Sequence, residues 1–396
     1  MRRLVVPIGV AFGLILIGAG PALAEPAPGV STAEQAVPGK KVCAITDERL
    51  DELSGIVATD DGFVVINDST SQSSRKRVFF LNGTCEVVDT VAYSGNGPRD
   101  TEDLVVSADG KTLWIADIGD NERQRPTVSL WSMPSDGSKR PVIHRLAYPD
   151  GPHDAEAMLL NGDGTPIIVT KEVNRPAALY VPAAPLKKDN SEGVPLRKAG
   201  EVTVPASTTP SNTLARLGRG TIDGGAVASG GGKVVLRTYT DALEWTVSGG
   251  DVLAALKGKP RVTPLPEEPQ GEAITFSPDG RYYYTVSDLQ GNPGGAENAI
   301  LQYKPVTKAA ITQASAGTPD GEGGPSWLDN LTIKDLTYLI VAVGLLGVIL
   351  VGVGIFGIRR ARNEPPEPAG KDGPAGTDGD GPKPADPATA LLGVGG

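Results

Sequence analysis

One short pattern recurs along the chain and restricts the folds that are open to it. In its clearest copy, Gly271–Asp288, a run of β-branched and aromatic residues leads into a Ser-Pro-Asp-Gly turn, and a second such run ends in a carboxylate. Two such runs around a turn that ends in glycine predict a β-hairpin. With Glu272 as the reference position, the same spacing recurs at Ser54 with Asp61-Gly62, Glu102 with Asp109-Gly110, Glu156 with Asp163-Gly164, and Gly224 with Gly231-Gly232.

The spacing of these five copies points to one architecture. Successive copies lie 48, 54, 68 and 48 residues apart. Such periods are in the range of propeller blades and are too long for leucine-rich or ankyrin repeats. The sequence therefore predicts an all-β, five-bladed β-propeller in residues 41–313, with the extra length of blade three in the connection Lys187–Gly200 and its last strand at Val202–Pro205.

The last copy is one strand short, and the start of the chain supplies a candidate. Lys41–Thr46 precedes blade one and has no partner in it. An open edge on a ring invites aggregation, and a strand from the opposite terminus would remove that edge. We therefore expect the N-terminal strand to complete blade five.

The first 24 residues have the features of a secretory signal peptide. Arg2-Arg3 precede an apolar run, and Ala22-Leu23-Ala24 supply small residues for cleavage. An uncleaved anchor is the alternative, and it would leave the Ala-x-Ala unexplained. Residues 25–40 are rich in Ala, Pro and Gly and are expected to form a linker.

A second apolar run lies near the other end. Leu336–Ile358 contains 23 residues without a charge, and Arg359-Arg360-Ala361-Arg362 follows it. This length spans a bilayer as one helix, and the basic cluster predicts that the C-terminus is cytoplasmic. We expect a single-pass protein of the cell membrane, with the propeller outside, a juxtamembrane linker at 314–335, and a disordered cytoplasmic tail at 359–396. A docking segment within the tail is the alternative.

Charge and cysteine content agree with an exported protein. The chain has 47 acidic and 37 basic residues, which argues against nucleic acid as a partner. Cys43 and Cys85 both lie in the exported part, where a disulfide can persist. The repeat places Cys43 in the strand that closes blade five and Cys85 in blade one, so a bond between them would join adjacent blades. Two separate buried thiols are the alternative.

The motifs resemble those of known propellers. The order of a small or acidic residue, an apolar strand, an Asp-Gly turn and a strand ending in Asp resembles NHL-type and related extracytoplasmic β-propellers. The strand openings at Ser54-Gly55-Ile56 and Glu272-Ala273-Ile274 resemble those of phytase-like, esterase-like propellers. This chain departs from that pattern at Ala157 and Ala273, which replace glycine, and at Gly224-Gly225, where no carboxylate stands.

Polar residues at one phase of the repeat should converge. The innermost strand of each blade begins beside the central channel, and the ends of the second strands lie on the same face. The predicted funnel residues, with Arg237 as a pairing partner, are Ser54, Asp68, Glu102, Asp117, Glu156, Lys171, Glu172, Arg237, Glu272 and Asp288.

Carboxylates crowded in a funnel repel one another, which raises their pKa values or demands a cation. Oxygen donors suit a hard cation such as calcium. The candidate calcium ligands are Glu102, Asp117, Asp120, Asn121, Glu156 and Glu272. In the alternative, the glutamates accept backbone N–H groups or pair with Lys171 or Arg237.

Other catalytic signatures are weak. The chain has no P-loop and no Gly-x-Ser-x-Gly elbow. His153 precedes Asp154 and Glu156 on the approach to the channel, and both a catalytic and a solvated loop histidine remain open. We expect a membrane-tethered propeller that binds an extracellular ligand or partner protein at its funnel. The alternative is a calcium-assisted, phytase-like or lactonase-like hydrolase, in which the metal would polarise a phosphoryl or carbonyl oxygen.

Overall fold

The structure is a computed structural model that describes residues 36–173, 175–211, 218–266, 268–289 and 297–307. All of these belong to the first of two compact units, Met1–Pro319. The predicted signal peptide, membrane span and cytoplasmic tail lie outside the described residues. Within the described part of the chain, no helix has the length and apolar character needed to cross a bilayer.

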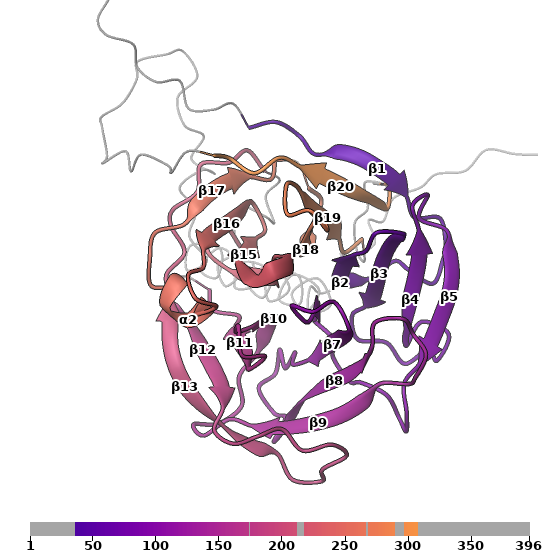
Figure 1. The fold of residues 1–396 in the computed structure, drawn as a ribbon, viewed down its shortest axis with the longest axis vertical. Helices are drawn as coiled ribbons and strands as arrows, with labels where there is room; N and C mark the ends of the chain where they lie inside the picture. The colour runs from indigo at the N-terminus through magenta and orange to yellow at the C-terminus, as the bar shows by residue number, and fades with distance from the viewer. Residues whose placement is uncertain (1–35, 174, 212–217, 267, 290–296, 308–396) are drawn as a thin grey trace, which may run out of the picture. The chain divides into compact units, whose positions relative to one another are not determined.

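The described part is nearly all β and has a propeller-like arrangement, with four-stranded antiparallel groups placed around a centre (Figure 1). The first group is β2 (Leu53–Ala58), β3 (Gly62–Asn67), β4 (Arg77–Asn82) and β5 (Val87–Ala92). The next is β6 (Asp103–Val106), β7 (Thr112–Asp117), β8 (Val128–Pro134) and β9 (Val142–Ala147). It is followed by β10 (Ala155–Leu160), β11 (Pro166–Thr170), β12 (Ala177–Pro182) and β13 (Val194–Val202).

The remaining strands complete the circle. One group is β14 (Ile222–Val227), β15 (Lys233–Thr238), β16 (Asp241–Thr246) and β17 (Arg261–Pro264). The last is β18 (Gly271–Phe276), β19 (Tyr283–Ser287), β20 (Ala299–Tyr303) and β1 (Lys40–Ala44). Helical structure in the described residues is limited to a 3₁₀ turn, Ser229–Gly231, and one short helix, α2 (Val252–Ala255).

The Asp-Gly dipeptides form the hairpin turns for a local reason. The Asp109, Asp163 and Asp279 carboxylates each accept the backbone N–H two residues later, at 2.9–3.1 Å. The glycine that follows each aspartate has a φ of 67–81°, a left-handed conformation that side chains disfavour. The repeat is therefore a repeat of turn chemistry as well as of strand pattern.

The N-terminal strand closes the ring as predicted. β1 pairs antiparallel with β20, and Ile45 N–H donates to the carbonyl of Asn298 at 2.8 Å. Cys43 and Cys85 form a disulfide with a Cα–Cα distance of 5.8 Å, which links β1 to the turn between β4 and β5. The predicted disulfide is confirmed.

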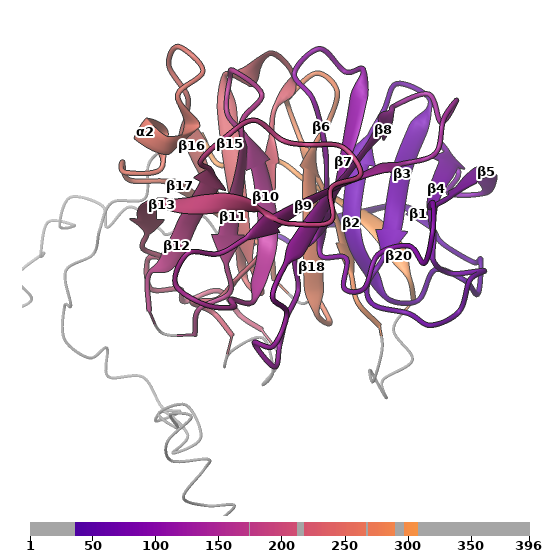
Figure 2. The same ribbon diagram turned by 90° about the horizontal axis from the view of Figure 1, so that it is seen from below.

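One feature of the outer strands differs from the prediction. β13 occupies Val194–Val202, inside the segment expected to be a connection and before the strand expected at Val202–Pro205. Val194 and Leu196 are buried while Pro195 and Arg197 are exposed, and this alternation fixes the strand there. Val194 and Pro195 also pair in parallel with β9, so that β6–β13 form one eight-stranded sheet (Figure 2).

The core consists of hydrophobic layers between successive four-stranded groups. One cluster joins β2–β5 to β6–β9 through residues such as Ile66 and Trp131. Corresponding clusters follow around the circle, and the last joins the group that contains β18 to the first group through Leu53, Phe79 and Val286. Because the last group packs against the first, the ring is closed.

Candidate functional site

A polar cavity of about 170 Å³ opens where the inner strands begin. Several lining residues follow the repeat. Ser54, Glu102, Glu156 and Glu272 belong to or immediately precede inner strands, whereas Asp68, Lys171 and Asp288 follow second strands. The full lining is Leu53, Ser54, Asp68, Glu102, Asn121, Glu156, Lys171, Tyr239, Gln270, Glu272 and Asp288.

A β-bulge explains how one residue of the inner strands β2, β10, β14 and β18 departs from the regular alternation of side chains. The register shifts at Ser54, Glu156 and Glu272, between the residues on either side of each. A bulge inserts one unpaired residue and re-aims its side chain. The equivalent bulge in β14 falls at Asp223. The sequence alignment of this copy at Gly224 is therefore wrong by one residue, and a carboxylate does stand at this position.

The Asp223 carboxylate is not part of the cavity lining. Arg237 lies between Asp223 and Glu268, with N–O distances of 3.2 and 2.9 Å, and all three side chains are fully buried. Arg237 also donates to the carbonyl of Ala273 at 3.0 Å, which ties β15 to β18. The predicted funnel residue Arg237 thus compensates buried carboxylates outside the cavity lining.

Three carboxylates form the tightest acidic group. One oxygen from each of Asp68, Asp100 and Glu102 lies within 4.8 Å of the other two. Burial is the main cause that raises the pKa of each, and the charges of neighbouring carboxylates add to it; the pKa of Asp68 is raised to about 7. We call Asp68, Asp100 and Glu102 the carboxylate triad.

Asp100 was missed in the sequence because it lies outside the repeat phase. It stands two residues before Glu102, in the segment that leads from β5 into β6. Asp100 lies at a bend outside the strands, so the alternation of side chains along a strand does not predict where its carboxylate points. Its closeness to Glu102 in the sequence was the signal that could have drawn attention to it.

The lining also carries one cation, beside a glutamate that neighbours Glu102 of the triad. Lys171 Nζ lies 2.5 Å from Glu156 Oε1, and Glu156 is the more deeply buried of the two. Burial alone would lower the pKa of Lys171, but the Glu156 carboxylate outweighs it and the net pKa is raised. An ammonium has three N–H donors. Glu156 accepts one, and it is the sole hydrogen-bond partner of this ammonium within the described ranges.

Gln270 links the two remaining carboxylates. Its side-chain amide donates to Glu272 Oε1 at 2.8 Å and to Asp288 Oδ2 at 3.0 Å. Burial, followed by the charges of Glu156 and Asp223, raises the pKa of Glu272 well above its ordinary value. Burial therefore favours the protonated form of the Glu272 carboxyl at the cavity wall.

Ser54 leaves a hydrogen-bonding group unused. Its side chain is buried, with 3% of the residue exposed, and it lines the cavity. In the part of the chain that the structure describes, its hydroxyl has no hydrogen-bond partner. A buried hydroxyl without a partner destabilises a protein, so it marks a place for a ligand or ordered water.

The predicted calcium loop is arranged differently from the expectation. Asp117 Oδ1 pairs with Arg125 at 2.7 Å, and the Asp120 carboxylate accepts the backbone N–H groups of Gln124 and Arg125. Glu172 lies 2.6 Å from Arg175 and 3.8 Å from Arg123. Asp117, Asp120 and Glu172 are thus engaged outside the cavity lining, while Asn121 lines the cavity.

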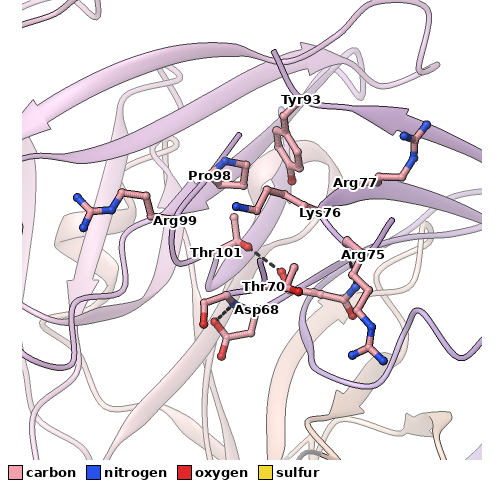
Figure 3. A pocket seen from close by; sticks show the side chains of 11 residues that line it. Asp68, Thr70, Arg75, Lys76, Arg77, Tyr93, Pro98, Arg99 and Thr101 are labelled. Carbon is pink, nitrogen blue, oxygen red and sulfur yellow. Dashed lines mark hydrogen bonds between the residues drawn. The ribbon is translucent and has the colours of Figure 1, made fainter. Parts of the chain in front are cut away.

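A smaller hollow shares the residue Asp68 with the lining of the cavity (Figure 3). Lys76, Tyr93 and Thr101 are among its lining residues, and the Lys76 ammonium extends toward Thr101. Its volume of about 10 Å³ admits about one water molecule. Asp68 therefore lines both a ligand-sized cavity and a water-sized one.

Comparisons with known proteins give only distant similarity. No model of a protein family matches the chain, and neither does any curated protein. Among solved structures, a gluconolactonase from Xanthomonas campestris is similar with a TM-score of 0.36 and 13% identity, over 64% of this chain and 72% of that one. The PQQ-bound aldose sugar dehydrogenase from Streptomyces coelicolor has a TM-score of 0.35 and 12% identity, over 66% and 96% of the two chains.

A third similar structure is the β-propeller domain of Cps50 (Swd1) from Myceliophteria thermophila. It has a TM-score of 0.33 and 12% identity, and the match covers 64% of this chain and 97% of that one. At TM-scores this low, the propeller assignment rests on the strand pairing and packing described above.

Proposed function

We propose that the protein is a metal-assisted hydrolase that binds one hard divalent cation, calcium, in its central cavity and cleaves an ester, lactone or phosphoester bond. The observation that carries this proposal is the carboxylate triad, of which Asp68 and Glu102 line the cavity. Calcium–oxygen bonds are 2.3–2.6 Å long, so two ligands on opposite sides of one ion are about 4.6–5.2 Å apart. The triad oxygens all lie within 4.8 Å of one another, so their separations do not exceed what one ion can span, and a cation would relieve the crowding of their charges.

The cavity residues suggest how a bond could be cleaved. A cation bound at the triad would polarise a carbonyl or phosphoryl oxygen. The free N–H donors of Lys171 can stabilise negative charge on an oxygen, and a protonated Glu272 can give a proton to a leaving group. Ser54 can orient the substrate by hydrogen bonding. One similar structure is a gluconolactonase, but the proposal rests on the cavity and not on that likeness.

Ligand binding without catalysis is the second candidate. It is favoured by the positions of the two histidines: His144 contacts Ser132, His153 contacts Asp150, and neither lines the cavity. Ser54 therefore has no histidine base beside it in the described residues. Such a protein would hold a ligand or a partner at the same cavity and leave it unchanged.

One experiment separates the candidates. The purified full-length protein is titrated with calcium by calorimetry, and model lactones, esters and phosphoesters are tested with and without calcium. A hydrolase should bind calcium and turn over one substrate class, and Asp100→Asn should lose both, whereas the exposed control Glu192→Gln should keep both. Calcium binding without turnover supports the binding protein, and absence of calcium binding contradicts the metal site.

We further propose five blades, counting each four-stranded group as one, and a tether in the cell membrane. Residues 1–24 would direct export and 336–358 would span the bilayer. Both proposals about targeting rest on the sequence. The cavity would then face substrates, ligands or partner proteins outside the cell.

A further inference from the structure

A second group of metal-binding side chains lies away from the central cavity. Asp150 and His153 stand in the connection between β9 and β10, and Tyr180 projects from β12. His153 Nε2 is 3.1 Å from Asp150 Oδ1 and 3.1 Å from the Tyr180 hydroxyl, which donates to Asp150 Oδ2 at 2.7 Å. An imidazole, a carboxylate and a phenol thus meet at one point.

The spacing of these atoms suits one coordination geometry. Two ligand atoms each about 2.1 Å from one ion are about 3.0 Å apart at a right angle and about 3.4 Å apart at the tetrahedral angle. The observed separations of 2.7–3.1 Å are hydrogen bonds, with His153 beside Asp150 Oδ1 and Tyr180 beside Asp150 Oδ2, and they are close to the right-angle value. An ion could therefore replace these hydrogen bonds with little movement of the side chains. Copper(II) binds such N/O ligand sets most tightly in the divalent series.

An ion can reach these side chains from solvent, and neighbouring aromatic rings hold them in place. The side chains of His153 and Asp150 are 21% and 49% exposed, so an ion can enter and water can complete its coordination. Tyr180 is buried, and the ring of Tyr148 packs against both His153 and Tyr180 with centroid distances of 4.9 Å. The aromatic packing holds the phenol and imidazole in place before any ion arrives.

We propose that Asp150, His153 and Tyr180 form a transition-metal site, selective for copper(II), that is separate from the central cavity. The ion takes the neutral imidazole nitrogen, a carboxylate oxygen and the phenolate oxygen, and the phenolic proton passes to solvent. The ligand set contains nitrogen and phenolate, whereas the triad offers only carboxylate oxygen. The two sites therefore select different metals.

The test uses the full-length protein with calcium in excess, so that carboxylates of the cavity do not compete for copper. Calorimetry should give one copper(II) per chain, and electron paramagnetic resonance should show one coordinated imidazole nitrogen. His153→Ala should abolish this binding. Tyr180→Phe should raise the dissociation constant for copper, because it removes one of the three ligands, and should remove the phenolate-to-copper absorption band.

The only other histidine in the chain provides the control. His144→Asn should keep the stoichiometry and the spectrum, because His144 lies elsewhere against Ser132 and Trp114. Thermal melting verifies that each variant is folded. The proposal is overturned if wild-type protein takes up no stoichiometric copper, or if folded His153→Ala binds copper with unchanged affinity and spectrum.

Discussion

At the scale of single residues, the buried hydroxyl of Ser54 should cost stability in the absence of a ligand or ordered water. Its buried hydroxyl has no partner among the described residues, and such a group costs about 1–3 kcal/mol. Ser54→Ala should therefore keep or raise the free energy of unfolding, by roughly 1 kcal/mol, while it weakens ligand binding or turnover. Urea unfolding and calorimetry with the ligand found above would measure the two effects.

Ser277→Ala is the matched control. Ser277 is also buried, but its hydroxyl donates to Asp279 Oδ1 at 2.6 Å and accepts two backbone N–H groups at 3.0–3.1 Å. Its loss should lower the free energy of unfolding by roughly 1 kcal/mol or more. Equal destabilisation by both substitutions would show that the Ser54 hydroxyl already has a structural partner.

The carboxylate triad makes stability depend on pH in a defined direction. The pKa of Asp68 is about 7 in the folded protein, against about 3.9 in an unfolded chain. Between these values the folded state binds more protons, so without calcium the free energy of unfolding should fall as pH rises from about 4 to about 7. Asp68→Asn should reduce the change of the free energy of unfolding with pH. Calcium should raise the free energy of unfolding of the wild-type protein at neutral pH.

Asp279→Asn provides the contrast for this pH series. The pKa of Asp279 is lowered to about 2, chiefly by the Ser277 hydroxyl, so this group is ionised in both states over most of that range. Its removal should leave the slope of stability against pH unchanged. Urea unfolding of the three proteins at about pH 5 and about pH 7.5 would decide, and a stability that rises with pH in wild type without calcium would contradict the assignment.

The location of a site residue could be predicted from the sequence where the residue occupies an equivalent position in each repeat. Ser54, Glu102, Glu156 and Glu272 share one phase, and the structure places them around one cavity. In the fourth copy the sequence alignment was wrong by one residue, because three consecutive glycines at the turn left its position open. In the structure, Gly231 has the left-handed φ of 70° and the bulge falls at Asp223. Asp100 belongs to a connection, which no strand pattern constrains.

At the scale of elements, the hairpins and the closing strand followed from the sequence because their causes are local or unavoidable. Asp-Gly turns are specified by four residues, and an unpaired edge on a ring leaves one strand to fill it. The parallel contact between β9 and β13 could not be predicted. It joins only two residue pairs, and it depends on how the long segment before β13 packs against its neighbour.

The closing strand and its disulfide should dominate stability. The crosslink has a sequence separation of 42, for which the chain-entropy model gives about 4 kcal/mol. Replacing both Cys43 and Cys85 by serine should cost about that amount in urea unfolding. A chain that begins at Asp47 should lose more, because it also lacks the pairing of β1 with β20. A chain that begins at Gly39 keeps both and is the control; similar melting of the Asp47 and Gly39 chains would contradict this role.

At the scale of the whole molecule, closure is what makes the cavity. Each four-stranded group contributes an inner strand, and hydrophobic clusters between neighbouring groups hold the inner strands around one centre. Crowded carboxylates from separate groups are kept together by this apolar packing against their mutual repulsion. The proposed cation site therefore destabilises the empty fold by repulsion between carboxylates, and a bound cation would remove that repulsion.

The predicted membrane span should decide where the molecule resides. If residues 336–358 span the membrane with the propeller outside, a chain that ends at Asp335 should be released into the medium in folded form, while the full chain stays in the membrane fraction. Protease added to intact cells should remove the propeller and leave a tag fused after Gly396 intact. Changing Arg359, Arg360 and Arg362 to glutamate should weaken this orientation, because basic residues beside the span retain the tail inside. A tag digested as readily as the propeller in wild type would refute the topology.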